Sequence, residues 1–501
     1  MRDITKTFGH ITANEKVSID VYHGEILALL GENGSGKTTL MNMLSGIYYP
    51  DSGQIFVDGR EVLIRSPKDA FDLGIGMIHQ HFKLVDVLTA TENIILGLKE
   101  KGKLDLKAAA ARIKEICDQY GFELNPNQKI YDMSVSQKQT VEIIKVLYRN
   151  ADILILDEPT AVLTPQETEK LFDVLRNMKK AGKTIIIITH KLNEVKEISD
   201  RVDVLRHGQF IGSLITKDTT TQEMTDMMVG HQVSLNIHRA DPVNPEDRIA
   251  VRGLTVRSED GLLKLDDVSF TAKSGEILGI AGISGCGQKE LLEAIAGLQV
   301  AESGSVTYID DDGSESELLG MDPVSIRKKG ITLSFVPEDR LGMGLVGNMD
   351  LSDNMMLRSF RFGKSVFTNR KKPKALAEHI VDELEVVTPG ISTPVRRLSG
   401  GNVQKVLVGR EIASAPKALL TAYAVRGLDI NSSYMIYDLL NKQKEAGVAV
   451  VYVGEDLDVL LELSDRILVL CGGKVSGILD ARKTDKNEVG LMMTSLHGTE
   501  A

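Results

Sequence analysis

The chain has 501 residues, with 59 Lys and Arg against 70 Asp and Glu and a formal net charge of −11. This length exceeds what one ordinary hydrophobic core accommodates, so we expect two or more domains. The acidic balance argues against a nucleic acid as the main partner, because nucleic-acid-binding proteins usually carry a basic excess or a basic face. The three cysteines lie far apart without a C-x-x-C pair, which is typical of a reducing compartment and gives no support to a structural zinc site.

Short aliphatic runs alternate with helical patterns along the chain. LALL at 27–30 precedes a glycine-rich loop, and ILIL at 153–156 and TIIIIT at 184–189 follow. This alternation predicts an α/β fold around a mostly parallel sheet. The runs are far shorter than a membrane span, so a function at a membrane would need another chain to supply the span.

The loop from Gly31 to Thr38 fits G-x-x-x-x-G-K-[ST] between a strand-like run and a helical pattern. In that context the backbone N–H groups and the helix N-terminus hold phosphate oxygens, Lys37 neutralises phosphate charge, and the Thr38 hydroxyl reaches Mg²⁺. An ordinary glycine turn is the alternative interpretation of this motif alone. The residues predicted to bind ATP here are Gly31, Glu32, Asn33, Gly34, Ser35, Gly36, Lys37, Thr38 and Thr39.

Polar side chains follow three of the predicted strands. Asp157 and Glu158 come directly after ILIL, where the first carboxylate suits a metal and the second suits an attacking water. His190 closes the TIIIIT run and Gln80 follows GMIH, so both are candidates to sense a γ-phosphate, and Gln80 is also a candidate metal ligand beside Thr38 and Asp157. A lone histidine after a strand is more often capped or solvated, so His190 and Gln80 are weak signals individually.

The second half of the chain repeats the first. GEIL at 24–27 returns at 275–278, and SDRV at 199–202 returns as SDRI at 464–467, so the repeat unit is a whole domain. The polar segment between the copies contains two prolines and reads as a linker. We expect a first domain over 1–235, a linker over 236–247 and a second domain over 248–501.

With these motifs, and with LSGGNVQKV at 398–406, the chain resembles a tandem ATP-binding-cassette ATPase of a bacterial importer over essentially its whole length. The resemblance implies two P-loop NTPase domains, each with a mostly parallel sheet and an inserted helical subdomain. It implies that the domains pack head to tail, with each ATP between the loop of one domain and the LSGGQ-like signature of the other. It also implies that Phe8 stacks on adenine, although a hydrophobic core contact is an equally good interpretation of Phe8. The residues implied to act across the interface are Ser399, Gly400, Gly401, Asn402 and Asp429.

Spacing places the counterparts of these motifs in the second copy. The 20 positions from Gln137 to Asp157 lead from Asn402 to Ala422. The replacements are Gln288 and Lys289 for Lys37 and Thr38, Ala422 and Tyr423 for Asp157 and Glu158, Glu455 for His190, Glu338 for Gln80, and Ser258 for Phe8. The phosphate cradle of each copy is its glycine-rich loop with the carboxylates that follow the neighbouring strand. The cradle of the second copy has therefore lost its positive charge, its metal ligand and its base together.

The signatures show the reverse pattern. The second copy keeps LSGGN at 398–402, whereas the first has MSVSQ at 133–137, and Thr164 stands where the second copy has Asp429. Head-to-tail packing would join the intact cradle of the first copy to the intact signature of the second. It would likewise join the altered cradle of the second copy to the altered signature of the first. The sequence therefore predicts one hydrolytic composite site and a second site kept as interface, whose nucleotide occupancy stays open.

GMIHQHFKLVDVLTATENIILG at 76–97 resembles the nucleoside branch of these importers, which is linked to basic-membrane-lipoprotein-like binding proteins, more than the ribose and galactose branch. The resemblance implies integral membrane permease subunits as partners, indirectly an extracytoplasmic substrate-binding lipoprotein, and a peripheral location at the cytoplasmic face of the cell membrane. A sugar importer is the alternative.

Two other classes of function are possible for a tandem cassette. A soluble translation factor resembles two intact cassettes with a longer charged linker, and this chain has neither. A non-hydrolysing ATP sensor is disfavoured by the intact Asp157, Glu158 and His190.

Overall fold

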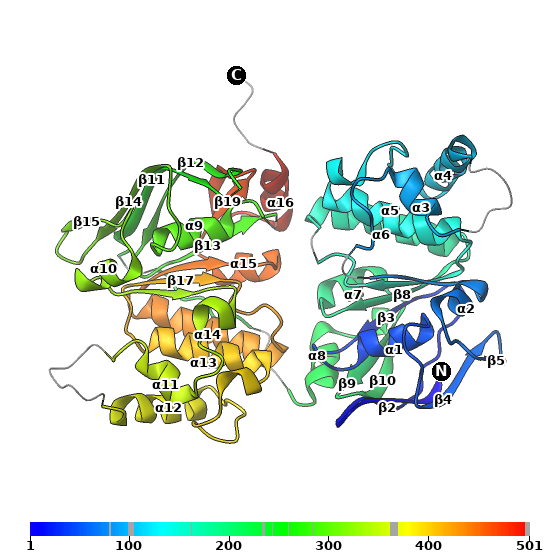
Figure 1. Cartoon of the computed structure of the whole chain (residues 1–501), viewed down its shortest axis with the longest axis horizontal. Coiled ribbons are helices and arrows are strands. Elements are labelled where there is room, and N and C mark those ends of the chain that lie inside the picture. The colour runs from blue at the N-terminus through cyan, green and yellow to red at the C-terminus, as the bar shows by residue number, and fades with distance from the viewer. Residues whose placement is uncertain are drawn as a thin grey trace. The chain divides into compact units, whose positions relative to one another are not determined.

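The computed structural model describes residues 1–79, 82–98, 105–161, 163–232, 236–242, 244–258, 260–283, 285–360 and 369–495. The chain divides into two compact units, Met1–Ser234 and Leu235–Ala501. Figure 1 colours the first unit from blue to green and the second from green to red. In the described parts, each unit has one six-stranded and one four-stranded sheet with helices around them.

The larger sheet of the first unit has the strand order β10-β9-β3-β8-β7-β6, and all neighbours are parallel except β9 and β10. Parallel strands end at one edge of a sheet, so the segments that follow β3, β7 and β8 meet there. The strands are β3 (Ile26–Leu30), β6 (Ile75–Ile78), β7 (Ile153–Asp157), β8 (Thr184–Thr189), β9 (Arg201–Arg206) and β10 (Gln209–Ile215). The antiparallel sheet contains β1 (Arg2–Phe8), β2 (Ile11–Val17), β4 (Ser52–Val57) and β5 (Arg60–Val62).

Apolar layers cover both faces of the larger sheet, which explains why its inner strands β3, β7 and β8 are aliphatic at nearly every position. Leu154 and Leu156 of β7 pack into one buried cluster, and Ile155 between them packs into another. Ile185 of β8 packs into the cluster of Leu154, and Ile186 packs into the cluster of Ile155. Successive side chains of a strand point to opposite faces, so ILIL and TIIIIT each supply two cores.

The helices of the first unit include a group that forms its own apolar cluster. α3, α4 and α5 contact one another and share buried residues such as Ile94, Ile113 and Ile144; Figure 1 shows them together at one end of the unit. They form the expected helical subdomain. The helices are α1 (Lys37–Leu44), α2 (Pro67–Asp72), α3 (Ala90–Ile95), α4 (Leu106–Tyr120), α5 (Val135–Tyr148), α6 (Pro165–Lys180), α7 (Leu192–Ile198) and α8 (Thr221–Val229).

The second unit repeats this topology. Its larger sheet has the order β16-β17-β18-β13-β19-β20, which matches the first sheet strand for strand, with β19 and β20 antiparallel. The strands are β13 (Ile277–Gly282), β16 (Leu333–Val336), β17 (Ala418–Ala422), β18 (Ala449–Val453), β19 (Arg466–Cys471) and β20 (Lys474–Asp480). The smaller sheet contains β11 (Asp247–Arg257), β12 (Leu263–Lys273), β14 (Ser303–Ile309) and β15 (Glu315–Glu317).

The helices of the second unit follow the same order as those of the first. They are α9 (Gln288–Ile295), α10 (Pro323–Lys328), α11 (Leu351–Met356), α12 (Lys371–Glu383), α13 (Gly400–Ile412), α14 (Ile430–Glu445), α15 (Leu457–Leu463) and α16 (Lys486–Thr494), with one π-helical turn at Arg340–Gly344. The expected α/β fold with two tandem domains is confirmed. Within the described ranges, no helix combines the length and the apolar character that crossing a membrane requires.

Part of the segment expected to be a linker packs on the second unit. Arg239 donates a hydrogen bond to the Leu461 carbonyl oxygen at 2.8 Å, and Ile237 lies against the apolar core that contains Leu460. Arg482 forms an ion pair with Asp241. The second unit therefore extends back to this segment.

Candidate functional site

The glycine-rich loop joins β3 to α1 at the carboxyl edge of the first sheet. Gly36 precedes α1 with φ of +94°, and a Cβ there would lie 2.3 Å from the Ala13 carbonyl oxygen, so only glycine fits. The buried Asn14 donates through Nδ2 to the Gly36 carbonyl oxygen at 3.2 Å, which fixes the loop on β2. The first backbone N–H groups of α1 have no partner inside the helix, so this end suits an anion.

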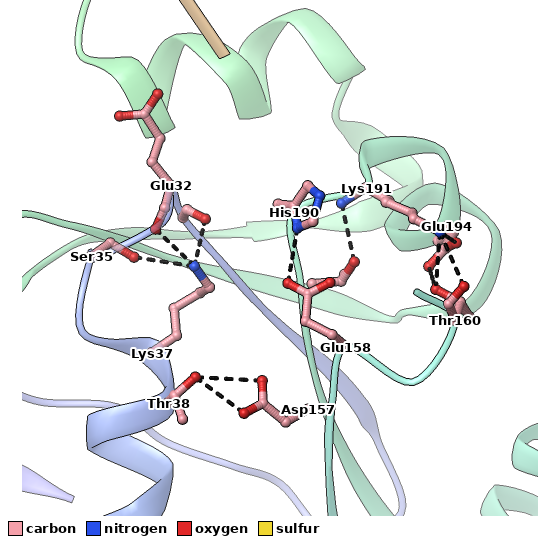
Figure 2. A network of polar contacts seen from close by, with 12 residues as sticks. Glu32, Ser35, Lys37, Thr38, Asp157, Glu158, Thr160, His190, Lys191 and Glu194 are labelled. Carbon is pink, nitrogen blue, oxygen red and sulfur yellow. Dashed lines mark hydrogen bonds and ion pairs between the residues drawn. The ribbon is translucent and has the colours of Figure 1, made fainter. Parts of the chain in front are cut away.

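Lys37 lies inside the loop. Its side chain is buried, and Nζ donates to the carbonyl oxygens of Gly31 at 2.7 Å and Glu32 at 2.9 Å. Figure 2 shows the Glu32 carboxylate turned away from this ammonium group. Burial lowers the pKa of Lys37, and the nearby Glu158 and Asp157 carboxylates oppose that shift. The loop therefore holds a partly desolvated cation where a phosphate would arrive.

Thr38 and Asp157 bring oxygen ligands together from α1 and the end of β7. The Thr38 hydroxyl donates to the Asp157 carboxylate, with oxygen–oxygen distances of 3.1 and 3.4 Å. Burial raises the pKa of Asp157, and the hydrogen bond from Thr38 acts against that rise. A buried carboxylate beside a hydroxyl is the donor set that Mg²⁺ prefers, so these residues fit the ion.

Glu158 occupies a strained backbone position. Its φ is +49°, which non-glycine residues rarely adopt and which is common at functional sites. Its Oε1 lies 2.9 Å from His190 Nδ1, as Figure 2 shows, and this hydrogen bond raises the pKa of His190. One oxygen is thus held, and the other, Oε2, is a buried acceptor without a hydrogen-bond partner among the described residues.

A second polar network supports this edge and was not predicted from the sequence. Lys191 donates through Nζ to Glu194 Oε1 at 3.1 Å and to the Thr160 carbonyl oxygen at 3.2 Å, and the Thr160 hydroxyl donates to Glu194. The network joins the loop after Glu158 to the residue after His190. The sequence did not indicate the contact among these three residues, because it forms only where β7 and β8 lie side by side.

The remaining predicted residues of the first unit surround this centre. Ser35 is buried, with Oγ 3.4 Å from Lys37 Nζ, whereas Asn33 and Gly34 are exposed and Thr39 is half-buried on α1. Gln80 lies outside the described residues.

Phe8 ends β1 with 43 % of its surface exposed, so it is not a core residue. The Tyr48 ring meets the Phe8 ring edge-on, with centroids 5.3 Å apart. A partly exposed, laterally supported ring is a suitable platform for a base. In the second unit Ser258 and Gln299 stand at the two equivalent positions, so both aromatic rings are missing there.

The second unit keeps the backbone of this centre and changes its chemistry. Gln288 begins α9 as Lys37 begins α1, is buried, and donates to the Ile283 carbonyl oxygen at 3.0 Å. Lys289 is half-exposed and lies 3.8 Å from Glu293 on its own helix, so it does not substitute for Lys37. Tyr423 has φ of +51°, nearly that of Glu158, and burial raises the pKa of its hydroxyl to about 12.

The signature of the second unit forms the first turn of α13. Ser399 caps the helix, and Asn402 links Ser399 to the Val387 backbone through hydrogen bonds of 2.8 and 2.9 Å. Gly400 and Gly401 follow the cap. A Cβ on Gly401 would meet its nearest atoms at 3.7 and 3.8 Å, which is ordinary contact, so packing within the unit does not require this glycine.

Asp429 has a local structural role. It caps α14, accepting hydrogen bonds from the Ser432 backbone N–H and hydroxyl, both at 2.7 Å. Thr164 caps α6 at the equivalent position of the first unit, together with Glu167. The role of Asp429 across an interface stays a prediction.

Comparison with known proteins agrees with this geometry. The model of the ABC transporter family matches residues 14–161 and 265–421, one segment in each unit. The chain belongs to the ABC transporter family. It is 42 % identical over 498 residues to the nucleoside import ATP-binding protein NupA of Lactococcus lactis, covering 98 % of this chain and 97 % of that protein. It is 42 % identical to the guanosine import ATP-binding protein NupO of Bacillus subtilis over 100 % of this chain and 98 % of that protein. The ribose import ATP-binding protein RbsA 1 of Rubrobacter xylanophilus is 38 % identical over 100 % of this chain and 98 % of that protein.

The family membership confirms that this ABC transporter protein is an ATPase with two tandem cassettes. It does not by itself assign roles to individual residues. Those assignments depend on the contacts around Lys37, Asp157 and Glu158 in the first unit and on the changes at their counterparts in the second.

Proposed function

We propose that this ABC ATPase hydrolyses ATP at one composite site and uses the energy to import nucleosides through separate membrane permease subunits. The observation that carries the proposal is the convergence of Lys37, Thr38, Asp157 and Glu158 in the first unit, combined with the loss of all four chemical groups in the second. Bound Mg²⁺ would neutralise phosphate charge and would be held by Thr38 and Asp157, with Gln80 as a further candidate ligand.

In this proposal the residues of the first unit have distinct tasks. Lys37 leaves the loop carbonyls and donates to the β- and γ-phosphates, beside the backbone N–H groups of the loop. Glu158 accepts a hydrogen bond from the attacking water through its free Oε2 while His190 holds Oε1. Phe8 stacks on the adenine ring.

The signature of the second unit completes the site. Glycine has a low helix propensity, and Gly400 and Gly401 are the first two residues of α13, so two glycines in succession call for a reason. The space around Gly401 within its own unit gives no such reason. Close approach of a phosphate to the backbone N–H groups of this turn would give such a reason. At the equivalent turn of the first unit, the side chains of Val135 and Ser136 would obstruct that approach.

The nucleoside substrate is supported by the two relatives at 42 % identity, and the ribose-import relative at 38 % supports the sugar alternative less well. An extracytoplasmic lipoprotein would deliver the solute, and this chain would lie at the cytoplasmic face of the membrane. The exposed side chains of Leu341, Met343, Val346 and Met349 support an apolar partner such as a permease. The net charge of −11 gives no support to nucleic-acid binding.

The test is uptake of labelled nucleosides and labelled ribose by cells that express this chain with its permease subunits. We expect nucleoside uptake that disappears in Glu158→Gln. Ribose uptake without competition by nucleosides would assign the protein to sugar import instead.

A further inference from the structure

The second unit carries new charged residues at the place that corresponds to Gln80, Glu158 and His190 of the first unit. Arg426 lies among the three replacements Glu338, Tyr423 and Glu455. Its Nε is 3.0 Å from Glu455 Oε1, its Nη1 is paired with Glu338, and its guanidinium carbon is 5.8 Å from the centre of the Tyr423 ring. The first unit has Ala161 at the equivalent position, so this cation belongs to the second unit alone.

A second arginine connects this cluster to the signature. Arg340 donates through Nη2 to the backbone oxygen of Arg426 and through Nη1 to the Gly400 carbonyl oxygen at 3.1 Å. One planar guanidinium thus bridges two segments that are separate in sequence, the loop before α14 and the first turn of α13. A lysine, with a single nitrogen, cannot reproduce this fork.

The bridge depends on residues that only the second unit possesses. Asn93 and Asn354 are equivalent, because each accepts a backbone N–H eight residues before it, at 2.7 and 2.8 Å. Gln80 precedes Asn93 by 13 positions and Glu338 precedes Asn354 by 16, so the second unit has three more residues here. The extra length lies around the π-helical turn Arg340–Gly344, which Asp339 caps and which begins with Arg340.

The charges of Arg340 and Arg426 explain why glutamates stand at positions 338 and 455. Arg340 and Arg426 are like charges close together, and burial and then this neighbour lower the pKa of Arg340. Glu338 and Glu455 supply the opposite charge on Arg426, so the set is balanced. Glu338 and Glu455, which replace Gln80 and His190, therefore form a structural ion-pair cluster with Arg426 in the second unit.

We propose that Arg340 is a positioning residue for ATP hydrolysis: supported by the Arg426 cluster, it holds the Gly400–Gly401 turn in the orientation that the working site needs. The proposal rests on the composite site proposed above. Ser399 and Asn402 hold the two ends of the turn, two consecutive glycines between them add little restraint, and the hydrogen bond from Arg340 to the Gly400 carbonyl oxygen supplies a further one. This gives the residues that replace Gln80, Glu158 and His190 a role in the second unit: they support the signature that serves the other site.

The experiment compares Arg340→Ala and Arg340→Lys in the full-length chain, with kcat for ATP hydrolysis and ATP binding measured separately, the binding in a Glu158→Gln background. We expect kcat to fall about 10- to 100-fold in Arg340→Ala and less in Arg340→Lys, because a small misplacement of a positioning group costs rate. ATP binding should be unchanged, since Lys37 and its loop lie in the first unit. A purely structural role would not separate these two quantities.

Matched variants make the outcomes distinguishable. Arg257→Ala removes another exposed ion pair of the same unit, with Glu302 at 2.7 Å, and should retain the wild-type kcat. Arg426→Gln should lower kcat, and combining it with Arg340→Ala should add little, because both act through one contact.

Gly401→Ser separates this proposal from the composite site. If Gly401→Ser is inactive while Arg340→Ala and Arg340→Lys have normal kcat, the role of Arg340 is refuted and the composite site stands. If Gly401→Ser is also normal, the composite site itself is refuted. Should Arg340→Ala fail to fold in thermal unfolding, the kcat of the folded Arg340→Lys protein decides.

Discussion

Restoring the lost phosphate charge by Gln288→Lys should destabilise the second unit without creating a second hydrolytic site. Gln288 is 2 % exposed and makes a neutral hydrogen bond to the Ile283 carbonyl oxygen. In the first unit, Glu158, Asp157 and Glu32 oppose the cost of burying the Lys37 ammonium. Their counterparts Tyr423, Ala422 and Ile283 carry no negative charge at neutral pH.

An ammonium without these carboxylates keeps a backbone acceptor but lacks charge compensation, so we estimate a loss of about 2 to 3 kcal/mol. For a unit of this size the melting temperature should fall by about 4 to 12 °C. ATP turnover should not rise, because Ala422 offers no metal ligand, Tyr423 is no base, and groups that act together do not add singly.

The assay is thermal unfolding and ATP hydrolysis of the full-length chain, with Gln288→Met as the matched control that removes the hydrogen bond without adding charge. Gln288→Lys should be less stable than Gln288→Met, and adding Ala422→Asp should recover part of the difference. Equal stability of the two single variants would refute the electrostatic reasoning, and a clear gain in turnover would refute the single-site assignment.

Three further outcomes are expected. Glu158→Gln should retain ATP binding and lose about 10²- to 10⁴-fold in turnover, as measured by steady-state hydrolysis; near-normal turnover would remove Glu158 from its role. Phe8→Ala should weaken ATP binding by about 10-fold with little change in kcat, and unchanged binding would exclude stacking. The raised pKa of His190 means that its pairing with Glu158 stabilises the fold below about pH 6.5 and that this contribution is lost as pH rises through the raised pKa. The His190 side chain is half-exposed, so its pair with Glu158 is worth under about 1 kcal/mol and the melting difference between wild type and His190→Gln should be small and confined to acidic pH.

The cradle and its loss could be predicted from the sequence because their signals are local. A loop of eight residues positions Lys37 and Thr38. The parallel sheet brings the end of β7, and with it Asp157, to the same edge as this loop. The register that pairs Gln288 with Lys37 followed from spacing, and the exposed Lys289 agrees with it.

Contacts that depend on packing between distant segments gave no such signal. Arg340 and Arg426 lie 86 positions apart and meet only because the π-helical turn reaches the loop before α14. Asp429 caps α14, a role that spacing did not indicate, since a carboxylate before a helix is a common cap. Arg239 reads as part of a polar linker, and its contact with the Leu461 carbonyl oxygen depends on the fold.

The most direct test of a single composite site is the rate of ATP hydrolysis by the full-length Gly401→Ser variant, with ATP binding measured on the same protein. The serine fits within the second unit, because its Cβ would meet neighbours at 3.7 Å or more, so folding should be retained. If the signature of one unit serves the cradle of the other, turnover should fall at least about 100-fold while ATP still binds at Lys37. Normal turnover in a protein whose only change lies 364 positions from Lys37 would contradict the pairing of the two units at one site.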